Sequence, residues 1–141
     1  MLYFVHRKNC FMKYMKWVGI IAAAVLVYSC FLPWIIVAGP NISAGGMDAG
    51  GTNFGKPGYF HLFFILLFLP FHLIPRLWAK RANVVVVALN MAWAIRNFFV
   101  LAICRGGDCP ERLLGLWLML IASVLMLLAA LFPDMDAVDN K

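Results

Sequence analysis

The amino-acid sequence predicts an all-α fold: a polytopic membrane protein built as a four-transmembrane-helix bundle. Three observations lead to this prediction: four long apolar segments, a composition that is 65% hydrophobic and only 13% charged, and basic residues that gather beside the apolar segments. An ordinary soluble domain carries about 25% charged residues, and a helix that crosses a bilayer needs about 20 apolar ones. A helical bundle is expected because lipid offers no hydrogen-bond partner to open backbone groups.

The first half of the chain predicts a basic tail and two spans. Residues 1–16 form the tail, and residues 17–37 run apolar for about the length of one crossing. Because this run continues past Cys30, cleavage there as a secretory signal is the less favoured interpretation. Residues 38–58 are polar and rich in glycine, which predicts a long loop. Residues 59–75 predict the second span.

The second half predicts two further spans, so that residues 17–132 form one transmembrane domain. The third span covers about residues 82–104 and the fourth about residues 113–132. Pro133 ends the last helix, because proline lacks the backbone N–H that a helix interior uses. Residues 133–141 form a second tail.

Lysine and arginine lie mainly on one side of these spans. Eight belong to the two tails and to the turn after the second span, three lie on the opposite side, and Arg96 lies inside the third span. Since basic residues near spans are retained in the cytoplasm, both termini are predicted to be cytoplasmic.

Arg96 is the charged residue within a predicted span. Its backbone lies eight residues before Cys104, so it is roughly 12 Å from the expected end of the span and near the midplane of a core about 30 Å thick. One interpretation is an anion site for a small ligand, a lipid phosphate or a carboxylate of a partner. The other interpretation is structural: the arginine holds the bundle together, or its side chain extends toward a carboxylate in an outer loop. The candidate carboxylates are Asp48, Asp108 and Glu111.

Other polar residues accompany Arg96 on the third span. Asn90 and Asn97 are seven residues apart and lie on nearly one helical face, with Trp93 beside them. One hypothesis makes Asn90, Trp93, Arg96 and Asn97 the wall of a polar pocket that binds a ligand or a partner. The alternative assigns the asparagines to hydrogen bonds between helices.

His61 and His72 are eleven residues apart on the second span and share a face. Histidine pairs on such helices can ligate haem, but the chain has only one further histidine, His6. Histidines at a helix interface explain the pair more simply. We therefore expect no haem, no other cofactor and no metal site.

Cys104 and Cys109 enclose a short segment with two glycines on the predicted outer side. Glycines permit the tight turn that a small disulfide ring needs, so the pair predicts a disulfide in an oxidising compartment. A structural clip is the favoured role. The alternative is redox chemistry like that of four-helix thiol oxidases that pass electrons to quinone, which the chain resembles in architecture only, since it has no C-x-x-C motif.

Four segments carry a further resemblance: GTNFGKPG, WAIRNF, CRGGDCPE and LFPD. Together with four spans in 141 residues, they resemble a group of small bacterial four-helix inner-membrane proteins that have no assigned function. The resemblance covers most of the chain. It implies the architecture and a bacterial inner (plasma) membrane location, and it implies no activity.

These observations predict a small integral membrane protein that is a structural or accessory subunit of a homo-oligomer or of a larger membrane complex. An enzyme is not expected, because the sequence offers no paired acid and base and no nucleophile with its base. The expected partners are membrane lipids and another membrane protein, and not nucleic acid, because the net charge of +6 lies beside the spans. Two alternatives remain: a small-molecule or lipid binder or transporter that uses the face around Arg96, and a thiol–quinone redox protein.

Overall fold

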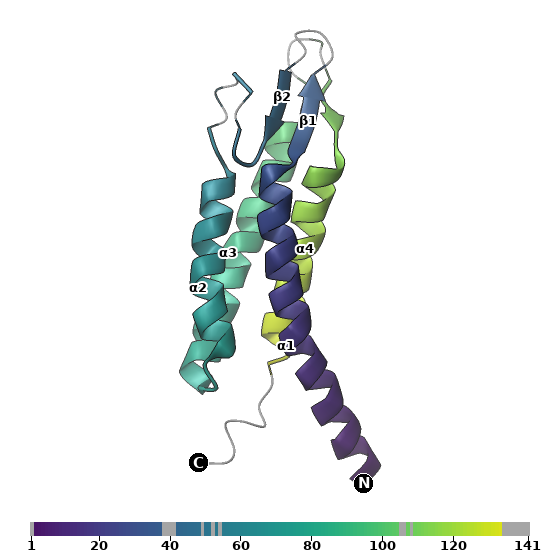
Figure 1. Ribbon diagram of the computed structural model, residues 1–141, viewed down its shortest axis with the longest axis vertical. Helices are drawn as coiled ribbons and strands as arrows, with labels where there is room; N and C mark the ends of the chain where they lie inside the picture. The colour runs from purple at the N-terminus through teal and green to yellow at the C-terminus, as the bar shows by residue number, and fades with distance from the viewer. Residues whose placement is uncertain are drawn as a thin grey trace.

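The computed structural model describes residues 2–133 except 38–41, 49, 52, 54, 105–106 and 108, and for residues 2–10 and 12 it describes the backbone alone. Four helices run lengthwise beside one another, and a small sheet closes one end of the bundle (Figure 1). We call this end the sheet end. The opposite end, which carries the turn between the second and third helices, is the basic end.

The helices are α1 (Leu2–Phe31), α2 (Gly58–Leu73), α3 (Leu77–Ala102) and α4 (Leu114–Leu131). Three of them contain a segment long and apolar enough to cross a membrane: Lys13–Phe31 in α1, and the whole of α3 and of α4. The chain is therefore a helical membrane protein. Helix α2 is apolar but has only 16 residues, about 24 Å at about 1.5 Å per residue, and a crossing needs about 20 residues. The described residues therefore contain three candidate spans, and the fourth span stays a prediction.

The first helix differs from the expected span over residues 17–37. Helix α1 includes the basic tail and ends at Phe31, and the last part of the apolar run, Pro33–Val37, forms strand β1. Pro33 explains the change, because its ring disfavours a helical conformation at Leu32 and it has no N–H to continue the helix. The residues that follow Pro33 are aromatic or β-branched, which suits a strand.

The sheet has three antiparallel strands in the order β2-β1-β3, with β2 at Ile42–Gly45 and β3 at Glu111–Arg112. Ile35 in the central strand lies opposite Ala44 of β2 and Arg112 of β3. The sheet therefore joins the segment after α1 to the segment before α4 across the sheet end.

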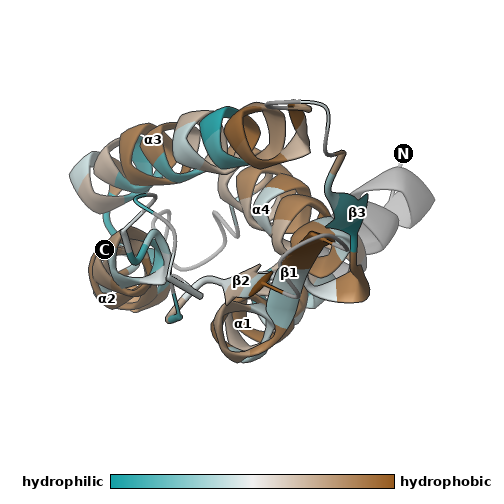
Figure 2. Ribbon diagram, turned by 90° about the horizontal axis from the view of Figure 1, so that it is seen from above, coloured by the Kyte–Doolittle hydropathy of each residue, from teal (hydrophilic) through white to brown (hydrophobic). Residues whose placement is uncertain are grey.

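The four helices surround one shared core, and each packs against two neighbours. Helix α4 packs against α1 and α3, and α2 packs against α3 and α1; seen from the sheet end, the helices are largely hydrophobic and β3 is hydrophilic (Figure 2). The core holds many small buried side chains, which let helix backbones approach closely in lipid: Ala22, Ala23, Ala94, Ala122 and Ala130.

Candidate functional site

Trp34 of β1 closes the bundle at the sheet end. Its side chain is fully buried, and its indole Nε1 donates a hydrogen bond of 2.7 Å to the carbonyl oxygen of Ser29. Its own carbonyl accepts from the backbone N–H of Leu113 at 2.8 Å. A Cβ added at Gly46 or Gly115 would lie 2.8 or 2.9 Å from indole atoms. Glycine at both positions therefore lets two backbone segments close around the ring.

Below Trp34 lies a buried polar cluster, the His61 layer, made of His61, Asn90 and Ser123. The Nδ1–H of His61 donates to Asn90 Oδ1 at 2.7 Å, and Asn90 Nδ2 donates to Ser123 Oγ at 3.2 Å. Ser123 Oγ donates in turn to the carbonyl of Met119 at 2.9 Å. These bonds connect α2, α3 and α4, and each residue donates to the next one in the chain of bonds. In such a chain, successive hydrogen bonds polarise and strengthen one another.

A second cluster, the His72 layer, lies toward the basic end and contains His72 and Asn83. The Nε2–H of His72 donates to the carbonyl of Lys16 at 3.1 Å, and Asn83 Nδ2 lies 3.5 Å from His72 Nδ1. A Cβ at Gly19 would lie 2.8 Å from His72 Nε2, so glycine makes room for the imidazole. The Lys80 ammonium donates to the carbonyl of His72 at 2.6 Å and satisfies one of the open carbonyls at the end of α2.

An apolar layer separates the two polar clusters. Asn83 and Asn90 are two helical turns apart, about 10.5 Å along α3. The space between them is filled by fully buried side chains from all four helices: Leu26, Phe68, Val87 and Met126. Each polar cluster therefore hydrogen-bonds neighbouring helices at one level of the bundle, and the two clusters do not form one continuous polar path.

The structure divides the four residues of the hypothetical pocket wall between two surfaces. Asn90 and Asn97 are buried and face the interior, whereas Arg96 is exposed and Trp93 is half-buried. The structure therefore brings Trp93 and Arg96 together and places the two asparagines on the interior side of α3. The sequence interpretation also missed Asn83, although its seven-residue spacing from Asn90 repeats the spacing of Asn90 and Asn97; it could have been found by that signal.

On the outer surface, Phe60, Trp93 and Arg96 form a continuous contact that we call the Trp93 stack. The rings of Phe60 and Trp93 have centroids 4.5 Å apart, and the Arg96 guanidinium carbon lies 4.9 Å from the Trp93 ring centroid. Trp93 Nε1 donates to the carbonyl of Pro57 at 3.2 Å. The start of α2 thus fixes Trp93, and Trp93 in turn orients the guanidinium by a cation–π contact.

Arg96 also lies closer to the end of its helix than the sequence suggested. Helix α3 ends at Ala102, so Arg96 is six residues, or about 9 Å, from the helix end. Its guanidinium makes no ion pair with Asp48 or Glu111, the carboxylates in the part of the chain that the structure describes. The third candidate partner, Asp108, lies outside the described residues.

Cys104 and Cys109 are joined by a disulfide, with their Cα atoms 4.3 Å apart. The bond closes the connection between α3 and β3. Among cysteines whose side chains are described, Cys30 is free and fully buried in the core.

Within the described residues, no three side chains of histidine, cysteine, aspartate or glutamate gather in a way that could hold a metal ion. Comparisons of the chain with protein-family models, with curated proteins and with solved structures found no match.

Proposed function

We propose that the chain is a small structural or accessory protein of a bacterial inner membrane that binds a second copy of itself or a larger membrane complex. The observation that carries this proposal is the Trp93 stack, which presents an ordered guanidinium on the outer side of α3. Tryptophan and arginine are enriched among the residues that dominate binding energy at protein interfaces. A side chain that is already ordered also loses less entropy when a partner binds.

The position of Arg96 on an exposed apolar face favours a partner outside the bundle. Its neighbours Ile95 and Phe99 are exposed apolar side chains, as expected for a surface that faces lipid. A charged side chain in hydrocarbon costs about 2.5 kcal/mol or more, and a carboxylate on a partner subunit would offset that cost. A lipid phosphate is the second candidate, because an arginine about 9 Å from the helix end can extend toward the headgroups.

The interior supports a structural role over transport. Side chains of the His61 layer and the His72 layer hydrogen-bond across helices, and fully buried apolar side chains lie between the layers. Conduction or transport needs a polar or hydrated path along the bundle. Buried hydrogen bonds between helices instead help to determine which helices pack against each other.

We also propose that both termini face the cytoplasm. The excess of lysine and arginine at the basic end supports this orientation. The sheet end, with the Trp93 stack close to it, would then face the outer side of the membrane.

Extraction of the tagged protein in lipid nanodiscs formed directly from membranes tests the proposal. The wild type is expected to elute as a defined assembly larger than one chain, and Arg96→Gln is expected to shift to the single chain while its thermal unfolding is unchanged. Arg81→Gln is the matched control, because Arg81 is an exposed arginine at the other end of α3, and it should keep the assembly. A wild type that is a single chain without co-purified protein contradicts the proposal.

A further inference from the structure

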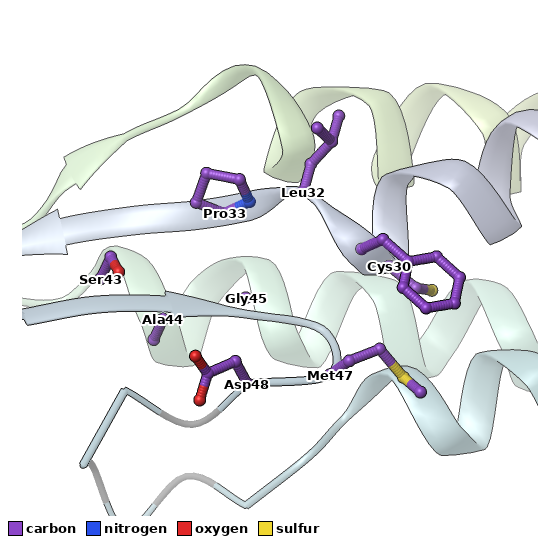
Figure 3. Close-up of a pocket in the computed structure, with 9 residues that line it drawn as sticks. Cys30, Leu32, Pro33, Ser43, Ala44, Gly45, Met47 and Asp48 are labelled. Atoms are coloured by element: carbon purple, nitrogen blue, oxygen red, sulfur yellow. The ribbon is translucent and has the colours of Figure 1, made fainter.

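A cavity of about 280 Å³ lies at the sheet end, beside the end of α1. Phe31 at the end of α1 is one of its apolar walls. Leu32, which follows α1, and Met47 from the turn after β2 give further apolar walls, and Ser43 and Asp48 supply polar side chains (Figure 3). Binding sites for small molecules usually have volumes of about 300–1,000 Å³. The cavity is therefore of a size that admits a small chemical group and not a large ligand.

The surroundings of this cavity favour a positive charge. The Asp48 side chain carries a carboxylate, of which Oδ1 accepts the backbone N–H of Gly50 at 3.1 Å. Phe31 ends α1, and the last turn of a helix carries about half a negative charge. None of the residues that line the cavity is a lysine, arginine or histidine. The exposed carboxylate of Asp48 and the end of α1 thus both place negative potential at this cavity.

The place of the cavity in the fold connects it to the membrane surface. The segment of α1 that is long and apolar enough to cross a membrane ends at Phe31, so the cavity lies at the end of a candidate span. Tyr28 and Phe31 are three residues apart and share a helical face, and 62% and 65% of their surfaces are exposed. This aromatic face leads from the cavity along the outer side of the helix, and aromatic side chains favour the membrane interface.

We propose that the cavity binds the primary ammonium head of an amine-bearing phospholipid, such as phosphatidylethanolamine, whose acyl chains lie along Tyr28 and Phe31. The ammonium group would donate charge-assisted hydrogen bonds to the carboxylate of Asp48. A choline head carries the same charge but has no N–H to donate, and a glycerol head carries no positive charge. The site goes beyond the proposed function, because it needs no protein partner.

Native mass spectrometry tests this site. The purified chain is offered equal amounts of phosphatidylethanolamine, phosphatidylcholine and phosphatidylglycerol with the same acyl chains. Because a hydrogen bond to a charged group is worth enough to change affinity about tenfold, the wild type should retain the ethanolamine lipid about tenfold over the glycerol lipid. Asp48→Asn should abolish this preference, since asparagine can still accept from Gly50 but has no charge. Asp48→Glu should keep it.

The matched control is Glu111→Gln, which removes an exposed carboxylate from β3, at the opposite edge of the sheet from β2. This variant should retain the ethanolamine lipid as the wild type does. Equal retention of the three lipids by the wild type, or an unchanged preference in Asp48→Asn, overturns the proposal.

Competition with soluble n-butylammonium separates a lipid head from a free amine and does not depend on a variant that folds. Displacement of the retained ethanolamine lipid by millimolar n-butylammonium, without displacement of the glycerol lipid, supports the site. Saturable binding of n-butylammonium to a chain that retains the three lipids equally would show a site for free amines and overturn the lipid assignment. Failure of n-butylammonium to displace the lipid contradicts an ammonium site.

Discussion

At the scale of single residues, the polar side chains of α3 form two groups, one that faces the interior of the bundle and one that faces outward. Asn83, Asn90 and Asn97 lie seven residues apart and face the interior, while Arg96 faces outward. The seven-residue spacing predicts a common face, and that part of the interpretation could be made from the sequence. The partners of the asparagines could not, because they depend on how α2 and α4 rotate against α3.

The hydrogen bond between His61 and Asn90 should have a measurable coupling energy. In a double-mutant cycle of His61→Leu and Asn90→Leu, unfolding in a bilayer-mimetic should show a coupling of about 0.6 kcal/mol, the mean for polar pairs in a membrane protein, and at most about 1.7 kcal/mol, the largest value found for such pairs. Asn97→Leu is the control, because Asn97 Nδ2 has no partner among the described residues, and it should not couple to His61. Additive effects of His61→Leu and Asn90→Leu would show that this bond does not tie α2 to α3.

At the scale of elements, the lengths of the apolar segments predicted the helices but did not predict the sheet. Residues 17–37 form a single apolar run in the sequence, and periodicity alone does not separate a buried strand from the end of a buried helix. Pro33 was the local signal for the break. Strand β3 has only two residues, too few to show a strand pattern in the sequence. Its pairing with β1 joins segments that are far apart in the chain, so local sequence could not predict it.

Trp34 should be the most costly single truncation in the sheet. Its indole fills the end of the bundle and contacts His61 edge-on, with ring centroids 6.1 Å apart. Trp34→Ala is expected to lower the free energy of unfolding by about 3–5 kcal/mol, as for other buried aromatic truncations. Trp17→Ala, at a tryptophan that is 60% exposed, serves as the control, and its cost should be much smaller. Equal costs for the two variants would mean that Trp34 does not close the bundle.

The connection between α3 and β3 should contain one disulfide. Intact-mass analysis after alkylation without reduction is expected to leave Cys104 and Cys109 unmodified, and alkylation after reduction should modify both. Two freely alkylated thiols at these positions, in protein isolated from an oxidising compartment, would contradict both a structural disulfide and a redox role for the pair.

At the scale of the whole molecule, the protein is a bundle with a basic end and a sheet end. The orientation rests on basic residues, so it is tested by labelling single cysteines in intact cells, in a background without the native ones. Cysteine at Lys56, on the sheet end, should react with an impermeant reagent, and cysteine at Arg81, on the basic end, should react only after the membrane is opened. Reaction at Arg81 in intact cells would reverse the orientation.

The membrane-facing surface determines whether the protein acts through partners. Large apolar side chains cover the outer sides of the helices, and lipid alone can satisfy them. The guanidinium packed against the Trp93 ring is what distinguishes one part of this surface from the rest. A partner is therefore expected beside Arg96 and not elsewhere on α3.

Site-specific photo-crosslinking in intact membranes tests this claim most directly. A photoreactive residue at Phe99, which is 62% exposed and one turn from Arg96, is compared with one at Val85, which is 60% exposed on the same helix but nearer the basic end. We expect a discrete protein adduct from Phe99 that disappears in Arg96→Gln, and no discrete protein adduct from Val85. Only lipid adducts from Phe99, or a protein adduct that Arg96→Gln leaves unchanged, would contradict it.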